Sequence, residues 1–193
     1  QRQHRRRARG VLPEHQPDRQ RLVLPRALGD LERVARLAVA FALGDLTATV
    51  SEALIARAQS APKDEFAEML GVATGHTEAP EDPRLARLLP NFEREGDEEF
   101  DGDNGLLRSL HENDIIRAKL VNLQVVNAAL GPTGGVEVTI EEGEAHQFIA
   151  ALNDMRLYAS ADDSGSEAAR EDRQRLIDWL AFCQDSLLDA LMG

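Results

Sequence analysis

The chain of 193 residues is poor in several features on which common protein functions depend. It contains one cysteine, Cys183, which excludes an intramolecular disulfide and any metal site built from several cysteines. No run approaches about 18 uninterrupted apolar residues, so we expect no membrane-spanning segment. A glycine-rich phosphate loop, a nucleophile elbow and a His-x-His pair are also missing, so we expect neither an enzyme nor a bound cofactor.

The composition that remains is that of an ordinary globular chain. Hydrophobic residues make up 42% and charged residues 29%, which predicts a packed domain rather than a disordered chain. The formal net charge of -12 disfavours a protein that coats nucleic acid, because phosphate binding draws on clustered Lys and Arg. With a single cysteine, this composition predicts a soluble protein of the reducing cytoplasm.

The charge is divided unevenly along the chain. Residues 1–41 hold ten arginines and four acids, a net of +6, whereas the remaining residues hold twelve basic and thirty acidic residues, a net of -18. A basic N-terminal segment of this kind can bind nucleic acid, fold back on the acidic remainder of the chain, or be an extension that does not belong to the folded domain. Twenty arginines against two lysines indicate GC-rich coding DNA, which gives such a mixture when it is read outside its true frame. We therefore treat residues 1–43 as a basic, poorly ordered or non-native N-terminal extension, and residues 44–193 as one helical domain.

Start and stop signals predict short and long helices after this extension. Asp45 is expected to cap a first helix, because its carboxylate can accept from free backbone N–H groups. Residues 62–70 are expected to form a short second helix. Asp82, followed by Pro83 at the first helical position, predicts another short helix that Pro90 stops.

Two capping boxes are expected to begin the longer helices that follow. In such a box, a Ser or Thr hydroxyl and the Glu three positions on satisfy each other's backbone donors. Ser109 with Glu112 is predicted to open the longest helix, which ends at Gly131. Thr139 with Glu142 is predicted to open the next one.

One strand and a last helix complete the expected fold. Residues 136–140 alternate as a strand does, and the only comparable run is residues 21–24. If the N-terminal extension is native, these two runs are expected to pair. The last helix carries Leu180, Cys183 and Leu187 on one apolar face. The predicted fold class is therefore mainly α, a single-domain helical bundle of about five to six helices with a minor β element.

Residues 93–103, hereafter the acidic segment, contain seven acids and one arginine. If Asp97 opened an EF-hand loop, the closing carboxylate would fall at Arg108, and a cation there is incompatible with calcium. We expect instead a solvated loop that docks a basic partner. The candidate partner-binding residues are Glu93, Glu95, Asp97, Glu98, Glu99, Asp101 and Asp103.

The other candidate metal-binding or reactive residues are best interpreted as structural. Glu142 and His146 are spaced for one helix face, but the paired Glu-x-x-His motifs of diiron bundles are missing, and we expect no metal site. His111 is interpreted as a surface histidine beside a helix start. Cys183 is interpreted as a buried small hydrophobe rather than a reactive thiol.

Six separated stretches carry a resemblance to a known family. They are residues 44–50 (GDLTATV), 82–90 (DPRLARLLP), 107–119, 136–140 (VEVTI), 153–157 (NDMRL) and 179–191 (WLAFCQDSLLDAL). Together they resemble an actinobacterial family long catalogued as a domain of unknown function and now described as AosR, the actinobacterial oxidative stress regulator. The resemblance covers about three quarters of the chain and does not include residues 1–43.

The resemblance implies a function without catalysis. It implies a cytoplasmic regulator that works with a stress sigma factor or RNA polymerase to raise transcription of cysteine biosynthesis genes under oxidative stress. It implies no catalytic residues and no cofactor. With one cysteine in the chain, any redox response must oxidise Cys183 singly or pair it with another molecule.

The acidic body favours contact with proteins over contact with promoters. A net charge of -18 repels phosphates but attracts a basic sigma factor or polymerase surface through electrostatic steering. Direct contact with DNA would use only the basic N-terminal segment. The alternative interpretation is a helical adaptor or scaffold protein in protein turnover with no redox role.

Overall fold

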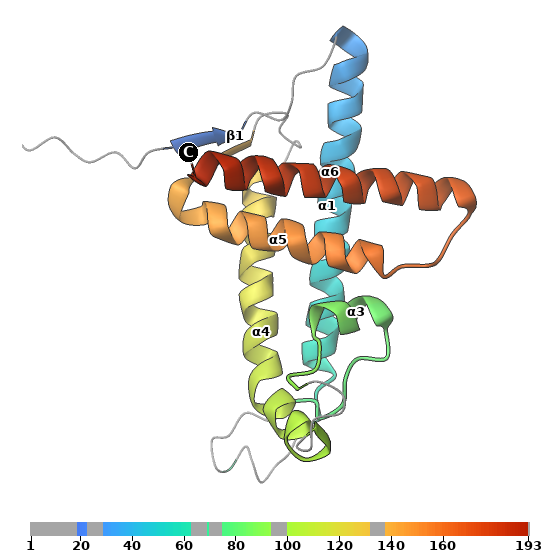
Figure 1. The fold of residues 1–193 in the computed structure, drawn as a ribbon, viewed down its shortest axis with the longest axis vertical. Helices are drawn as coiled ribbons and strands as arrows, with labels where there is room; N and C mark the ends of the chain where they lie inside the picture. Colours follow the sequence, from blue (N-terminus) through green and yellow to red (C-terminus); the bar gives the residue numbers. More distant parts are fainter. Residues whose placement is uncertain are drawn as a thin grey trace, which may run out of the picture.

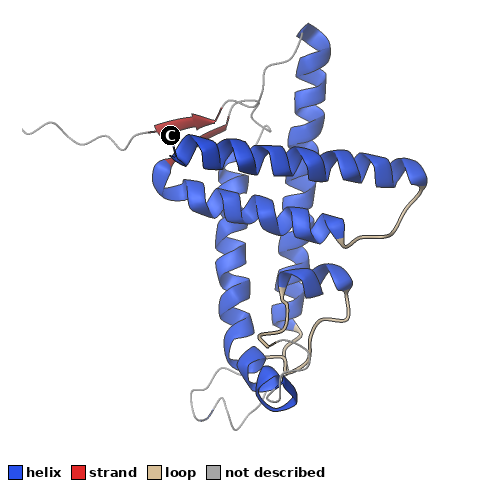
Figure 2. Ribbon diagram, viewed as in Figure 1, coloured by secondary structure: helices blue, strands red, loops and turns tan. Residues whose placement is uncertain are grey.

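The computed structural model of the protein describes residues 19–22, 29–62, 69, 75–93, 100–131 and 138–192. Within these ranges the chain is mainly helical, and the predicted fold class is confirmed (Figure 2). The helices are α1 (Gly29–Gln59), α3 (Pro83–Leu88), α4 (Phe100–Leu130), α5 (Glu142–Ser160) and α6 (Glu167–Met192), and the strands are β1 (Arg19–Leu22) and β2 (Val138–Glu141).

Two pairs of long helices make the body of the fold. α1 and α4 form one pair, and α5 and α6 form an antiparallel pair that crosses the first (Figure 1). α5 is the central helix, because it contacts α6, α4, α3 and α1. The core lies where these helices meet and includes Val50, Leu54, Ile116, Leu123, Val126, Phe148, Leu152, Met155, Leu180 and Leu187. These residues recur at helical spacing, and each large apolar side chain buried there contributes roughly 2 kcal/mol.

α1 is one continuous helix, so the predicted helix start at Asp45 is wrong. Asp45 lies exposed in the middle of α1, and its backbone carbonyl accepts the Thr49 hydroxyl at 2.8 Å. The preceding Gly44 costs roughly 1 kcal/mol relative to alanine, which is too little to end a helix that buries its other face in the core. The proposed domain boundary after residue 43 stays a prediction.

Part of α1 also bears on the membrane expectation. Val39–Gln59 is long and apolar enough to cross a membrane by length and composition alone, with a mean hydropathy of 1.5. A search for uninterrupted apolar runs therefore misses this segment, because a few polar residues interrupt it. A single helix of this kind is weak evidence for a membrane protein, because the core helix of a globular domain has the same composition. Here Val50 and Leu54 lie in the core, and 28% of the most apolar window of the segment is buried inside the structure.

α3 begins as the sequence predicts. The Oδ1 atom of Asp82 accepts from the Arg84 backbone N–H at 2.9 Å, and Pro83 occupies the first helical position. Leu88, the last residue of α3, is buried. The short helix predicted for residues 62–70 lies almost entirely outside the described residues.

α4 begins at Phe100, well before its predicted start, so the capping box of Ser109 and Glu112 is wrong. The Ser109 hydroxyl donates to a backbone carbonyl one turn back at 2.8 Å, and the Glu112 carboxylate is buried among cations instead of capping the helix. Residues 100–103 of the acidic segment are therefore helical rather than loop. The predicted end of α4 is confirmed, since Gly131 follows the last helical residue with a φ of 62°.

β1 and β2 form an antiparallel ladder in which Arg19 lies opposite Glu141. The pairing predicted for residues 21–24 and 136–140 is thus confirmed, with the strand bounds shifted along the chain. The ladder lies at the end of the molecule where the C-terminal end of α6 lies (Figure 1).

The start of α5 differs from the predicted second capping box. Thr139 remains in β2, two residues before the N-cap of α5. The N-cap residue is Glu141, whose side chain makes no capping hydrogen bond, and Glu142 is the first helical residue. The strand therefore continues directly into the helix, and the predicted box is wrong because the ladder holds its first residue.

Candidate functional site

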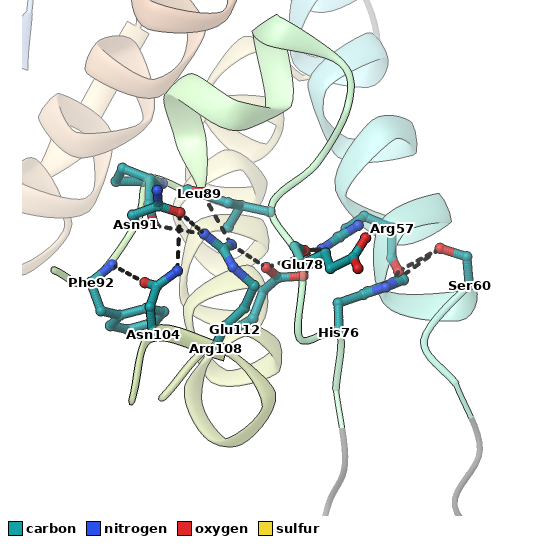
Figure 3. Close-up of polar contacts among 11 residues, drawn as sticks. Arg57, Ser60, His76, Glu78, Leu89, Asn91, Phe92, Asn104, Arg108 and Glu112 are labelled. Carbon is teal, nitrogen blue, oxygen red and sulfur yellow. Dashed lines mark hydrogen bonds and ion pairs between the residues drawn. The ribbon is translucent and has the colours of Figure 1, made fainter. Parts of the chain in front are cut away.

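Asn104 joins the two ends of the acidic segment. Its Oδ1 atom accepts from the Phe92 backbone N–H at 2.9 Å, and its Nδ2 atom donates to Oδ1 of Asn91 at 3.4 Å (Figure 3). Asn91 and Phe92 precede the acidic segment, whereas Asn104 follows it in the first turns of α4. These two hydrogen bonds therefore close the base of the acidic segment.

Arg108 is fully buried next to this closure, with 0% of the residue exposed. Its Nη1 atom donates to the Leu89 carbonyl at 3.2 Å and to Glu112 at 2.6 Å. Its Nη2 atom donates to the Pro90 carbonyl at 3.2 Å and to Oδ1 of Asn91 at 2.8 Å. One guanidinium group thus fixes the residues after α3 to the side of α4, where the acidic segment begins.

Glu112 lies between two guanidinium groups that come from different helices (Figure 3). One carboxylate oxygen accepts from Arg57 Nε at 2.7 Å, and the other accepts from Arg108 Nη1 at 2.6 Å. Arg57 Nη2 also donates to the Glu78 carbonyl at 2.5 Å. The three side chains, hereafter the buried ion network, are Arg57, Arg108 and Glu112. They connect α1, α4 and the loop before α3, and loss of one partner would leave a buried charge uncompensated.

Ser60 and His76 lie beside this network, and their contact resembles a nucleophile and its base. Ser60 Oγ is 3.2 Å from His76 Nε2. Nε2 is also 2.9 Å from the Arg57 carbonyl, and a carbonyl oxygen only accepts, so Nε2 carries a proton there. Because that nitrogen has no free lone pair, it cannot take the Ser60 proton. The pair instead satisfies a carbonyl at the C-terminal end of α1.

The structure describes only part of the predicted partner-binding surface. Glu93 is half-buried, Asp101 lies in the first turns of α4, and Asp103 is exposed there. Glu95, Asp97, Glu98 and Glu99 lie outside the described residues. The assignment of these seven acids to partner binding therefore stays a prediction. The contacts of Asn104 with Asn91 and Phe92, on either side of the segment, are described.

Cys183 lies in α6 with 4% of the residue exposed, as the sequence predicts for a residue of the apolar face. Burial raises the pKa of its thiol to about 12. The thiolate is the form that reacts with oxidants, so burial protects this cysteine at neutral pH. Its redox role stays a prediction.

The remaining predicted candidates lie on the surface. Glu142 and His146 are both exposed on α5. His111 is exposed on α4, and its ring centroid lies 6.2 Å from that of Phe92. In the part of the chain that the structure describes, no group of three or more His, Cys, Asp or Glu side chains is placed to hold a metal ion.

The sequence interpretation missed the buried ion network. Glu112 was assigned to a cap, and Arg108 served only to exclude calcium. The i, i+4 spacing of Arg108 and Glu112 was the available signal, because such pairs lie on one helix face. Arg57 and Glu112 are 55 positions apart, and no local pattern predicts their contact.

Comparison with known proteins places these features in a family context. The family described as "Domain of unknown function (DUF2017)" matches residues 25–191. Proteins of Mycobacterium bovis and Mycobacterium tuberculosis, each named oxidative stress regulator AosR, are 36% identical over 155 residues, which is 71% of this chain and 71% of theirs. A Mycobacterium leprae relative is 37% identical over 110 residues, 52% of this chain and 50% of its own. The predicted family resemblance is confirmed, and no solved structure matches the chain.

Proposed function

This chain belongs to the DUF2017 family, and on that premise we propose that it is a regulator in the oxidative stress response. It acts without catalysis, in the cytoplasm, by contact with a stress sigma factor or RNA polymerase. That contact raises transcription of cysteine biosynthesis genes. The name of the mycobacterial relatives supports the regulatory role, and the family resemblance of the sequence supports the choice of partner.

The observation that carries this proposal is the closure of the acidic segment by Asn104 and Phe92. The segment holds seven acids and one arginine, a net charge of -6, on a body that is itself acidic. A basic protein surface is drawn to such a segment by electrostatic steering, which raises the association rate. DNA is repelled by the same charge, so the proposal assigns the contact to protein.

The buried ion network supports this role by fixing the residues that precede the acidic segment. Arg108 holds the chain before the segment through the Leu89 and Pro90 carbonyls and the Asn91 side chain. A loop whose ends are held in place loses less conformational freedom on binding than one whose ends move. The network therefore lowers the entropic cost of docking without itself contacting the partner.

The experiment neutralises the seven acids of the segment as Glu→Gln and Asp→Asn in the full chain. Binding to the purified stress sigma factor and RNA polymerase of the source organism is measured at low and high salt. We expect affinity to fall at least about tenfold at low salt, and the salt dependence to shrink, because rim charges act mainly through steering.

A matched variant neutralises seven exposed acids elsewhere and should bind as the wild type does. These are Asp163, Glu167, Glu171, Asp172, Asp178, Asp185 and Asp189, on α6 and the linker before it. An equal loss of partner affinity in both variants would mean that only the net charge of the protein matters. The acidic segment would then not be the contact site. Recovery of protease components in place of sigma factor or polymerase would favour the adaptor in protein turnover.

A further inference from the structure

An open cleft of about 580 Å³, hereafter the cavity, lies between α1, the loop before α3, α3 itself and α5 and is broadly exposed to solvent. Its volume falls in the range of small-molecule sites, roughly 300 to 1,000 Å³. Ala53 and Ala56 of α1, Pro80 of the loop and Leu85 of α3 supply an apolar wall. The small alanine side chains leave the space that a larger residue would fill. Nothing in the proposed partner contact uses this cavity.

Tyr158 brings an unused hydrogen-bond donor to the cavity. The residue is 4% exposed and lines the cavity from α5, and its hydroxyl has no hydrogen-bond partner among the described residues. Burial raises the pKa of this phenol, so the hydroxyl keeps its proton at neutral pH. The hydroxyl is not among the fully buried polar atoms that lack a partner, so it faces the open space of the cavity and can donate to an acceptor on a ligand there.

Two guanidinium groups line the same cavity. The Arg84 guanidinium lies 5.1 Å from the centroid of the Tyr158 ring, and its Nε and Nη2 atoms donate to Asp82. Its Nη1 atom has no partner among the described residues. Arg57 also lines the cavity, and its own Nη1 is unused in the described part of the chain. The inner donors therefore include a phenol and two guanidinium N–H groups.

The acids near the cavity do not cancel these donors. Glu78 and Glu81 are exposed, so water screens their charge. Asp82 is occupied by Arg84, whose hydrogen bond lowers the pKa of that carboxyl. Asp162 also acts on Tyr158 and Arg84, and its carboxylate is paired with Arg173 at 3.3 Å. The lining thus offers a phenol and two guanidinium groups as donors beside an apolar wall, a combination that suits an anion with an apolar body.

We propose that this cavity binds a small organic carboxylate. The carboxylate accepts from Tyr158 and from Arg84 Nη1, and the apolar body of the ligand packs on Ala53, Ala56 and Leu85. Arg57 belongs both to this cavity and to the buried ion network, so occupancy is coupled to the base of the acidic segment. The coupling rests on the proposed function, whereas the binding does not.

The test titrates the full chain with sodium benzoate at constant ionic strength and follows backbone amides by nuclear magnetic resonance. Benzamide, of the same shape without the charge, is the matched probe. We expect saturable shifts around the cavity with benzoate and binding at least about tenfold weaker with benzamide, because a hydrogen bond to a charged group exceeds one to a neutral group. Equal shifts with both probes, or shifts that do not saturate, would overturn the proposal.

Two variants locate the site without removing a core contact. Tyr158→Phe keeps the ring under Arg84 and deletes the hydroxyl, and Ala56→Leu fills the cavity from an exposed position of α1. Each variant is expected to lower the affinity for benzoate at least about tenfold. The exposed change Arg117→Gln, outside the cavity, should leave that affinity unchanged. Unaltered affinity in both cavity variants contradicts the assignment.

The coupling has its own readout. Benzoate is expected to shift the amides of Phe92 and Asn104 and to change partner affinity of the wild type. Benzoate that binds without either change overturns the coupling and leaves the cavity site standing. If benzoate fails to bind while the acidic-segment variant still loses its partner, the cavity proposal fails alone and the proposed function is unaffected.

Discussion

Glu112 and Arg57 form a buried ion pair of 2.7 Å across 55 positions of the chain. The pair joins the last turn of α1 to the side of α4, and Arg108 extends it to Asn91, which precedes the acidic segment. Two long helices and a loop are thus registered against one another at one end of the molecule. We expect the network to select one conformation of this loop, because an apolar contact would tolerate several.

Glu112→Gln should therefore destabilise the fold strongly. The variant leaves Arg108, which is fully buried, without its carboxylate, and such losses are about 3 to 5 kcal/mol. Urea unfolding should show a lower midpoint with an unchanged slope. Arg117→Gln, which breaks an exposed pair with Asp114, is the control and should change stability by less than about 1 kcal/mol. A loss in Glu112→Gln as small as in the control would show that the network carries no stability.

Asn104→Ala should open the base of the acidic segment while the rest of the fold stays intact. It deletes both hydrogen bonds that join Asn104 to Asn91 and Phe92, each worth about 1 kcal/mol. Hydrogen exchange of the Phe92 amide should accelerate by about fivefold or more, because its acceptor is gone. Exposed Gln124→Ala, also on α4, should leave that amide unchanged. An unchanged exchange rate in Asn104→Ala would contradict the closure.

The fold was predictable where local chemistry decides it. Asp82 with Pro83 fixed the start of α3, and Gly131 fixed the end of α4, because each acts on its own backbone. Two capping boxes failed because tertiary contacts hold the same residues elsewhere. Thr139 stays in the ladder with β1, and Glu112 is turned toward Arg57.

The candidate site was predictable only in its charge. Composition alone marks residues 93–103 as acidic, and this identified the segment before the fold was known. Its closure depends on Asn104, a polar residue directly after the acidic segment, and on a backbone N–H twelve positions earlier. The Tyr158 cavity was missed for the same reason, since its walls come from segments that are distant in sequence. Such contacts follow from packing rather than from spacing.

Asp154 should give the protein a measurable pH dependence. Burial raises the pKa of this carboxyl, and the opposing hydrogen bond from Lys119 Nζ, at 2.7 Å, offsets only part of that effect. The native state therefore holds the proton more tightly than the unfolded state, so this group's contribution to stability is lost as pH rises from about 3.8 through the folded pKa.

Asp154→Asn removes that loss, because the amide does not ionise. Its stability relative to the wild type should rise with pH across the same window, by at most about 1.4 kcal/mol per pH unit. Urea unfolding from pH 3.5 to 7 measures the difference. Arg117→Gln, which leaves Asp154 in place, should follow the wild-type trend. A difference that stays constant or falls with pH would mean that Asp154 is ionised at no cost.

Cys183 decides whether a redox signal can act directly on this chain. At pH 8 a thiol with a pKa of about 12 is ionised to about one part in 10⁴, against roughly a quarter for an unperturbed thiol. Native Cys183 should therefore react with a disulfide reagent roughly a thousandfold more slowly than a cysteine at exposed Ala190 in a Cys183→Ala background. Urea should abolish the difference, because it removes the burial that raises the pKa.

Slow reaction of the native thiol would mean that oxidation of Cys183 must wait for α6 to separate from α5, which it contacts most extensively. The rate would then follow the opening of this helix pair and saturate as reagent concentration rises. Peroxide sensing by this route requires partner binding or stress to open the pair first. A native rate equal to that of the Ala190→Cys control would instead make Cys183 an accessible sensor, and an intermolecular disulfide through it would become the direct form of the signal.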